Sequence, residues 1–121
     1  MNSHISSLLC NLGITANYTA YHYITYAVEL AACDPSRLNL VTKKLYPTVA
    51  RHFSSTAGSV ERNIRRSVDL AWQNNPQLLE DMAGYHLDRR PCASQFLAML
   101  TTEYKKGLTN RSSSVNQLTF F

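Results

Sequence analysis

Apolar residues recur at spacings of three and four along most of this chain, and this period constrains the fold more than any other feature of the sequence. Such spacing places apolar side chains on one side of an α-helix, whereas a half-buried β-strand needs strict alternation, which is absent here. Glycine is also scarce, at four residues in 121. The sequence therefore predicts an all-α fold.

Residues that begin or end helices divide the chain. Gly13 can adopt the left-handed backbone that often follows a helix C-terminus, and Asp34 followed by Pro35 is typical of a helix N-terminus. Residues 108–121 are rich in Ser, Thr and Asn, and we expect a flexible polar tail there, beyond a domain of residues 1–107. The predicted helices span residues 3–12, 19–33, 35–45, 47–53, 58–73, 76–82 and 94–105.

Positive charge is concentrated in one stretch of the chain. The net charge is +4, and residues 43–66 alone carry six cations and one anion, or +5, so the remainder sums to −1. A basic block on a nearly neutral body is typical of a site for a polyanion, although a solvated surface gives the same pattern. The charged residues of this block are Lys43, Lys44, Arg51, Arg62, Arg65, Arg66 and Glu61.

Other residue patterns argue against catalysis and metal binding. The four histidines are far apart, and no paired-carboxylate, HExxH or glycine-rich phosphate-loop spacing occurs. The three cysteines Cys10, Cys33 and Cys92 are widely spaced, which favours a reduced cytoplasmic protein with thiols in the core over disulfides or zinc. No stretch reaches the ~18 apolar residues needed to span a membrane. We therefore expect no enzyme activity, cofactor, metal or membrane partner.

Residues 47–72 have the pattern of a helix-turn-helix. This motif needs a short first helix, a tight turn, and a second helix with one packed face and one bare face. Ala50 is a small residue where the two helices would cross, and Val60 and Ile64 would pack from the second helix. The sequence therefore predicts that the second helix presents its bare face to the major groove of DNA.

Apolar and charged residues separate on this second helix. At about 100° per residue, positions 60, 64, 68, 71 and 72 fall within an arc of about 120°, with Arg62 and Arg66 opposite. Arginine can donate two hydrogen bonds to guanine and glutamate can accept one from cytosine, so Glu61 beside Arg62 suits a reader of G·C pairs. An ordinary surface ion pair between Glu61 and Arg65 is the alternative. The predicted base-contacting residues are Ser59, Glu61, Arg62 and Asn63, and the predicted phosphate-contacting residues are Lys43, Lys44, Ser55, Thr56, Arg65 and Arg66.

Several short stretches, in order over roughly residues 5–106, carry a resemblance to a known family. They are LGI at 12–14, TKKLYP at 42–47, VERNIR at 60–65, AW at 71–72, GY at 84–85 and SQFLAM at 94–99. In these stretches the sequence resembles the C-terminal effector domain of the stage-zero sporulation response regulator of spore-forming bacteria.

The resemblance implies a compact six-helix, bundle-like domain that regulates transcription by binding a short TG-C-GAA type promoter box in double-stranded DNA. It further implies head-to-tail pairs on tandem boxes and contact with the sigma factor of RNA polymerase. Glu61 and Arg62 match the family's base-contacting pair, and Arg65 matches a DNA-contacting arginine. The region implicated in polymerase contact matches residues 78–85, where Leu79 and Tyr85 are the candidates.

Two departures from the family pattern bear on the DNA box. Gly58 and Ser59 replace a Ser-Arg pair that touches DNA, and Asn63 replaces a small apolar residue. One cationic contact is therefore missing, and the box itself is not predicted. The alternative function is a helical protein–protein adaptor or anti-repressor that uses the same basic face for an acidic partner.

Overall fold

The computed structural model describes the backbone of residues 3–120 and the side chains of residues 4–107. All secondary-structure elements in this part are helical: six α-helices, one 3-10 helix and one π-helix. This confirms the all-α prediction. Four of the α-helices are α1 (Ser3–Asn11), α2 (Thr19–Cys33), α3 (Tyr46–His52) and α4 (Ala57–Asn74). The remaining elements are the 3-10 helix η1 (Pro35–Asn39), the π-helix η2 (Val41–Leu45), α5 (Pro76–Ala83) and α6 (Ala93–Phe120).

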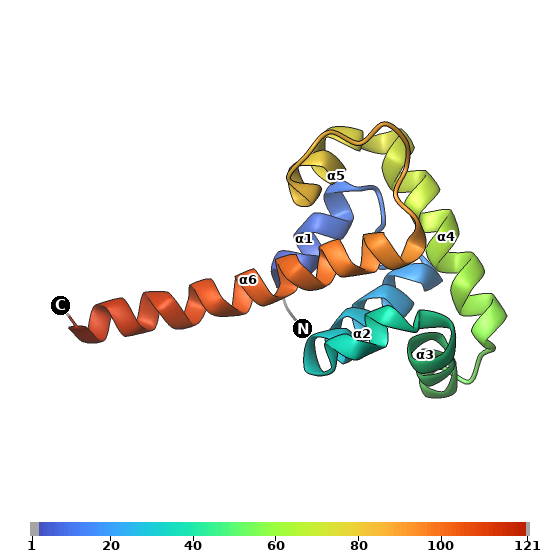
Figure 1. Cartoon of the computed structure of the whole chain (residues 1–121), viewed down its shortest axis with the longest axis horizontal. Helices are drawn as coiled ribbons and strands as arrows, with labels where there is room; N and C mark the ends of the chain where they lie inside the picture. The colour runs from blue at the N-terminus through green and yellow to red at the C-terminus, as the bar shows by residue number, and fades with distance from the viewer. Residues whose placement is uncertain (1–2, 121) are drawn as a thin grey trace.

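The helices surround one apolar core. Figure 1 shows α2 and the first part of α6 at the centre, with α4 along one side, α1 and α5 at one end and α3 at the other. Burial of these apolar side chains is the main force that fixes each helix in position and rotation. The largest fully buried side chains are Ile5, Leu9, Leu12, Ile14, Ile24, Val28, Leu45, Ile64, Leu79, Phe96, Leu97 and Leu100.

The C-terminal end of α1 is joined to the end of α4. Gly13 has a φ of 89°, which confirms the prediction that it ends the first helix. The side-chain amide of Asn74 donates to the Leu12 carbonyl at 3.4 Å, and that of Asn75 donates to the Asn11 carbonyl at 3.2 Å. A Cβ at Gly13 would collide with the Asn74 amide, so any other residue here would displace the group that bonds to Leu12.

The predicted helix over residues 35–45 is wrong, because the chain breaks at Leu40 into η1 and η2. Leu40 has φ −139° and ψ 57°, far from helical values. Pro47 helps to explain the wide turn of η2, because in a regular helix its ring would collide with the carbonyl four residues earlier. The break places the Lys44 carbonyl next to Arg37, which a continuous helix would not do.

Three further expectations concern the last helix, the tail and the cysteines. The last helix was expected to end at about Lys105, whereas α6 continues to Phe120 and leads away from the other helices (Figure 1). Side chains beyond Gly107 lie outside the described residues, so the flexible tail stays a prediction. The expectation of core thiols is wrong, because all three cysteines are exposed. Cys33 ends α2 and Cys92 precedes α6, and Cys10 lies on the outer side of α1.

Candidate nucleic-acid interface

α3 and α4 form a helix-turn-helix whose turn is held by hydrogen bonds. Ser54 adopts a left-handed backbone with φ 54°, a conformation that costs a non-glycine residue about 1–2 kcal/mol. The Ser55 amide donates to the Ala50 carbonyl at 2.8 Å, and the Ser55 hydroxyl accepts from Tyr23 of α2 at 3.0 Å. The turn is therefore fixed both to α3 and to the body of the domain.

The rotation of α4 is set by a fully buried row of side chains. Val60, Ile64, Val68 and Ala71 are at most 2% exposed, and Trp72 is half-buried against the edge of the core. The predicted apolar face is therefore confirmed. A helix packed in this way has little freedom to turn, so the directions of its outer side chains are also fixed.

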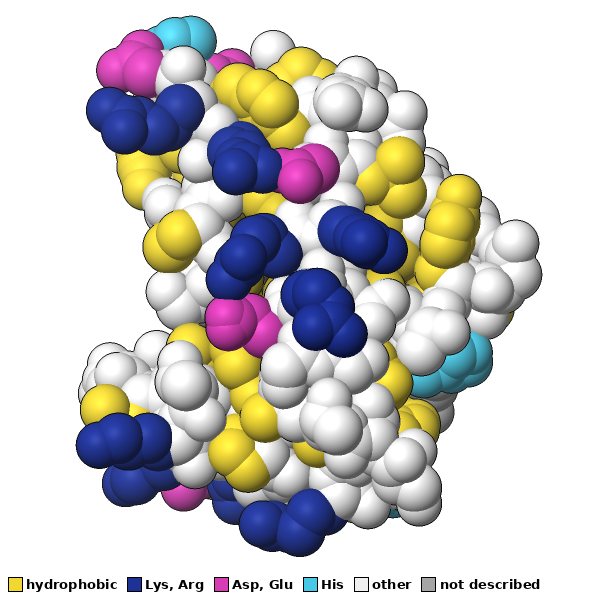
Figure 2. Space-filling model, turned by 90° about the vertical axis from the view of Figure 1, so that its right-hand side faces the viewer, with side chains coloured by type: hydrophobic (Ala, Val, Ile, Leu, Met, Phe, Trp, Pro, Cys, Tyr) yellow, Lys and Arg dark blue, Asp and Glu magenta, His cyan; other side chains and the backbone are white. Residues whose placement is uncertain are grey.

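The opposite face of α4 is basic. Arg62 and Arg66 are exposed, and neither has an ion-pair partner among the described side chains. Figure 2 shows basic side chains gathered over this side of the molecule, with acidic side chains between them. The face that sequence periodicity assigned to DNA is thus open to solvent and carries free positive charge.

The other predicted base-contacting residues make contacts within α4. Glu61 accepts from the Arg65 guanidinium at 2.8 Å, so the alternative ion pair is present. Asn63 donates its amide to the Ser59 carbonyl at 2.8 Å and to the Ser59 hydroxyl at 3.4 Å. In this conformation Arg62 alone of the four has no such contact.

The predicted phosphate-contacting residues surround α4. Thr56 is the N-cap of α4, and its hydroxyl accepts from the Ser59 amide at 3.1 Å. A hydroxyl that accepts one bond keeps its own proton for another acceptor, so Thr56 and Ser55 remain able to donate to phosphate. Lys43 and Lys44 are exposed on η2, which leads directly into α3.

Glu61 and Arg65 also face η2. Together with Val41 and Thr42 of η2 they line a hollow of about 240 Å³, which Tyr46 also lines. Burial raises the pKa of the Tyr46 hydroxyl, and the neighbouring Glu61 carboxylate raises it further. The ion pair and η2 thus lie on the same side of α4.

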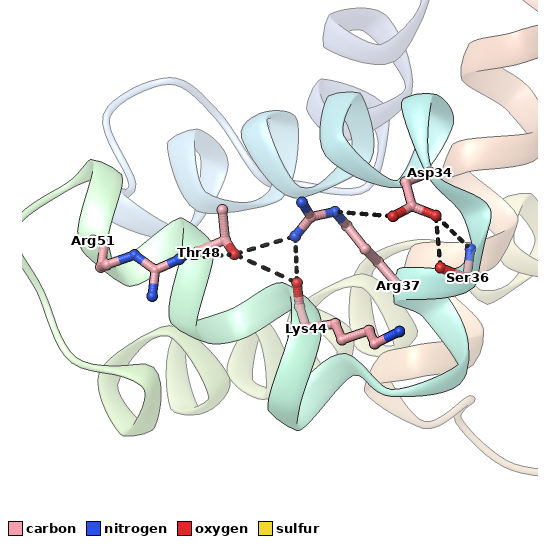
Figure 3. Close-up of polar contacts among 6 residues, drawn as sticks. All are labelled: Asp34, Ser36, Arg37, Lys44, Thr48 and Arg51. Carbon is pink, nitrogen blue, oxygen red and sulfur yellow. Dashed lines mark hydrogen bonds and ion pairs between the residues drawn. The ribbon is translucent and has the colours of Figure 1, made fainter.

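Arg37 holds the start of the helix-turn-helix (Figure 3). Its guanidinium donates to the Lys44 carbonyl and, at 3.1 Å, to the hydroxyl of Thr48 in α3, while Asp34 lies 3.8 Å from its Nε. The Ser36 hydroxyl donates to Asp34 at 2.6 Å and lowers the pKa of that carboxyl. These bonds connect η1 to η2 and α3 and so fix the helix that precedes the turn.

The two polymerase-contact candidates differ in exposure. Leu79 is fully buried and its side chain packs in the core, which argues against a direct contact, so its role at the polymerase stays a prediction. Tyr85 is 52% exposed, and its hydroxyl accepts from the Gln95 amide at 2.9 Å.

Sequence reasoning assigned no DNA-binding role to the loop of residues 84–92. Arg90 in this loop forms an ion pair with Asp69 on α4, and Arg89 beside it is exposed. The only local signal is the arginine pair before Pro91. At the end of the loop, a hydrogen bond from Ser94, with a sulfur–oxygen distance of 3.3 Å, lowers the pKa of the Cys92 thiol.

The described part of the chain holds neither a metal cluster nor a membrane span. Among these residues no group of histidine, cysteine and acidic side chains could hold a metal ion. No described helix is long and apolar enough to cross a membrane.

Comparison with protein families places the fold. A family model described as the C-terminal domain of sporulation initiation factor Spo0A matches residues 5–104, most of the 121-residue chain. The match spans the helix-turn-helix, the buried row of α4 and the first part of α6. The family consists of DNA-binding transcription factor domains and is not a family of enzymes. The chain therefore belongs to the family of C-terminal domains of sporulation initiation factor Spo0A, and so to the DNA-binding regulators of sporulation.

Proposed function

We propose that this chain reads a short, G·C-containing promoter box by placing the N-terminal half of α4 in the major groove of double-stranded DNA. The outward position of Arg62 carries this proposal. Arg62 stands near the start of a helix whose opposite face is fully buried, and no described carboxylate occupies it. Its guanidinium is thus available for the two-bond contact with guanine O6 and N7.

The dimensions of α4 suit the groove. The helix has 18 residues and is therefore about 27 Å long, and with side chains an α-helix is about 10–12 Å across. The major groove of B-DNA is about 12 Å wide and admits one α-helix. The turn before α4 and the preceding α3 then lie against the sugar-phosphate backbone, as in other helix-turn-helix proteins.

We assign the residues around Arg62 either to base edges or to phosphate. Base edges are contacted by Arg62 and, around it, by Ser59, Glu61 and Asn63. Glu61 presents its carboxylate to a cytosine amino group while Arg65 holds it in place. The phosphate-contacting set consists of Lys43, Lys44, Ser55, Thr56, Arg65 and Arg66.

The test begins with selection of bound duplexes from a random library by the wild-type chain. The enriched box and a scrambled duplex are then titrated at equal salt with wild type, Arg62→Ala and Lys105→Ala. Lys105 is an exposed cation on α6 and serves as the matched control for loss of one charge. We expect Arg62→Ala to lose about 1–3 kcal/mol of preference for the box and the control to lose none.

Two outcomes would contradict the proposal. If no sequence is enriched, the basic face binds polyanions without reading bases, and the adaptor function becomes the better account. If Arg62→Ala discriminates as well as wild type, α4 is not oriented in the groove as described.

We further propose that the domain pairs head-to-tail on tandem boxes and activates through the polymerase sigma factor, with Tyr85 as the contact. Tyr85→Phe keeps the ring but removes the hydroxyl that Gln95 binds, and Tyr85→Ala removes both. In transcription with purified polymerase, Tyr85→Ala should lower activation without changing affinity for a single box. An equal loss of box affinity would place Tyr85 in the DNA interface instead.

A further inference from the structure

We propose that the loop of residues 84–92 is a second DNA-contacting element, in which Arg89 binds the phosphate backbone beside the groove that α4 enters. This inference rests on the proposed function and adds a contact outside the helix-turn-helix. The loop connects α5 to α6, and in Figure 1 it descends beside α4.

The loop is attached to the exposed side of α4. Arg90 forms an ion pair with Asp69, which follows Arg65 by about one helical turn. Between the loop and α4 lies an open hollow of about 620 Å³, lined by Arg65 and Val68 from α4 and by Arg89 from the loop. The loop thus extends the basic face sideways, on the flank of α4 that carries Arg65.

The loop is held in shape by several contacts. Gly84 ends α5 with a φ of 84°, and the Leu87 amide donates to the Glu80 carboxylate at 2.8 Å. The same carboxylate lies 2.5 Å from His86 Nδ1, and Pro91 is buried. A loop fixed in advance loses little conformational entropy on binding, so a single charged contact can add to affinity.

The charge distribution favours phosphate as the partner. Asp88 lies 3.4 Å from His86, and Arg90 is neutralised by Asp69. Arg89 is exposed and has no ion-pair partner among the described side chains. A helix in the major groove has one phosphate row on each side, so a cation beside the Arg65 flank faces one of these rows.

The test uses the full chain on a duplex that carries one copy of the box selected by wild type. Salt dependence of binding is measured for wild type, Arg89→Ala and the control Lys105→Ala. We expect Arg89→Ala to lower affinity about two- to five-fold for every duplex and to reduce the slope of log K against log salt by about 0.9. Phosphate ethylation should inhibit wild type at a position next to the box and leave Arg89→Ala unaffected there.

The outcomes separate this inference from the proposed function. If wild type selects no box, the proposed function fails, and the inference fails with it. If wild type selects a box but Arg89→Ala matches Lys105→Ala in slope and ethylation pattern, only the loop contact is overturned. A defect confined to tandem boxes would assign Arg89 to a contact with a second copy of the chain and would also overturn it.

Discussion

The two sides of the exposed face of α4 hold their arginines in different ways. On one side, Arg65 pairs with Glu61 and Arg90 of the loop pairs with Asp69, so each of these guanidinium groups is next to a carboxylate. On the other side, Arg66 has no carboxylate partner and borders a hollow of about 450 Å³ near the start of α2. The carboxylates orient the arginines of the paired side before DNA arrives, whereas the open side keeps its full positive charge.

This difference predicts different contributions to binding. Exposed ion pairs are worth at most about 1 kcal/mol, so they orient side chains without holding them firmly. An arginine beside a carboxylate attracts phosphate less, because the two charges largely cancel at a distance. We therefore expect the open side to supply more of the salt-dependent affinity, while the paired side orients Glu61 for a base contact that adds to that of Arg62.

The largest effect is expected from a change in the buried row of α4, which anchors both sides of the exposed face. Ile64→Ala should lower the free energy of unfolding by about 2–5 kcal/mol, because Ile64 is fully buried and its truncation leaves a cavity. Urea denaturation measures the change. Arg62→Ala on the opposite face of α4 is the control and should change stability by no more than about 0.5 kcal/mol. Equal denaturation midpoints for the two variants would show that α4 is not anchored through this row.

This anchoring is the part that the sequence predicts well. The bounds of α4 fall within one residue of those predicted, because Thr56 caps the helix and Asn75 with Pro76 ends it. The burial of Val60 and Ile64 follows from the helical period alone. Local sequence signals are therefore sufficient to predict the bounds and the buried face of a helix that packs against a single core.

The next effect concerns the paired side of α4. Glu61→Gln keeps the shape of the side chain but removes the charge that holds Arg65. We expect tighter binding to scrambled duplex, with a salt slope steeper by up to about 0.9, because Arg65 contacts phosphate without a competing carboxylate. Preference for the selected box should fall by about 1–3 kcal/mol as the contact to cytosine is lost. Gel-shift titrations over a salt series measure both quantities.

The same titrations separate two roles for Glu61. Tighter binding with an unchanged preference would make Glu61 only the partner of Arg65. That result would match the surface ion pair that was the alternative interpretation of the sequence. A change in preference alone would show that Arg65 stays in place without its carboxylate.

A smaller effect is expected on the open side. Arg66→Ala should weaken binding to all duplexes alike, by up to about 1 kcal/mol, and should lower the salt slope by about 0.9. The variant Arg51→Ala is a comparison, since Arg51 is also exposed but donates to Thr48 at 3.5 Å. A loss confined to the selected box would move Arg66 into the base-contacting set.

The paired side is also where the sequence was least informative. Asp69 and Arg90 are separated by more than twenty positions, and their contact depends on how α5 and the loop return to α4. The helical period of the sequence does not show where a loop packs, so it does not predict that Arg89 lies beside α4. Leu79 shows the converse, because a resemblance can assign a segment to a partner while the individual side chain belongs to the core.

The smallest effect probes the edge of the paired side through Cys92, which lines the loop hollow together with Arg65. The hydrogen bond from Ser94 stabilises the thiolate and lowers the pKa of Cys92 below the ordinary 9.0. A lowered pKa means that thiolate is present at lower pH, so the alkylation rate of Cys92 should reach half its maximum below pH 9.0. Peptide mass spectrometry distinguishes Cys92 from Cys10, which is also exposed. In Ser94→Ala the midpoint of the alkylation curve should rise toward pH 9.0, and an unchanged midpoint would show that the hydroxyl does not stabilise the thiolate.

Carboxymethylation of Cys92 places a negative charge beside Arg65. A measurable fall in DNA affinity after this modification would locate the paired side close to phosphate.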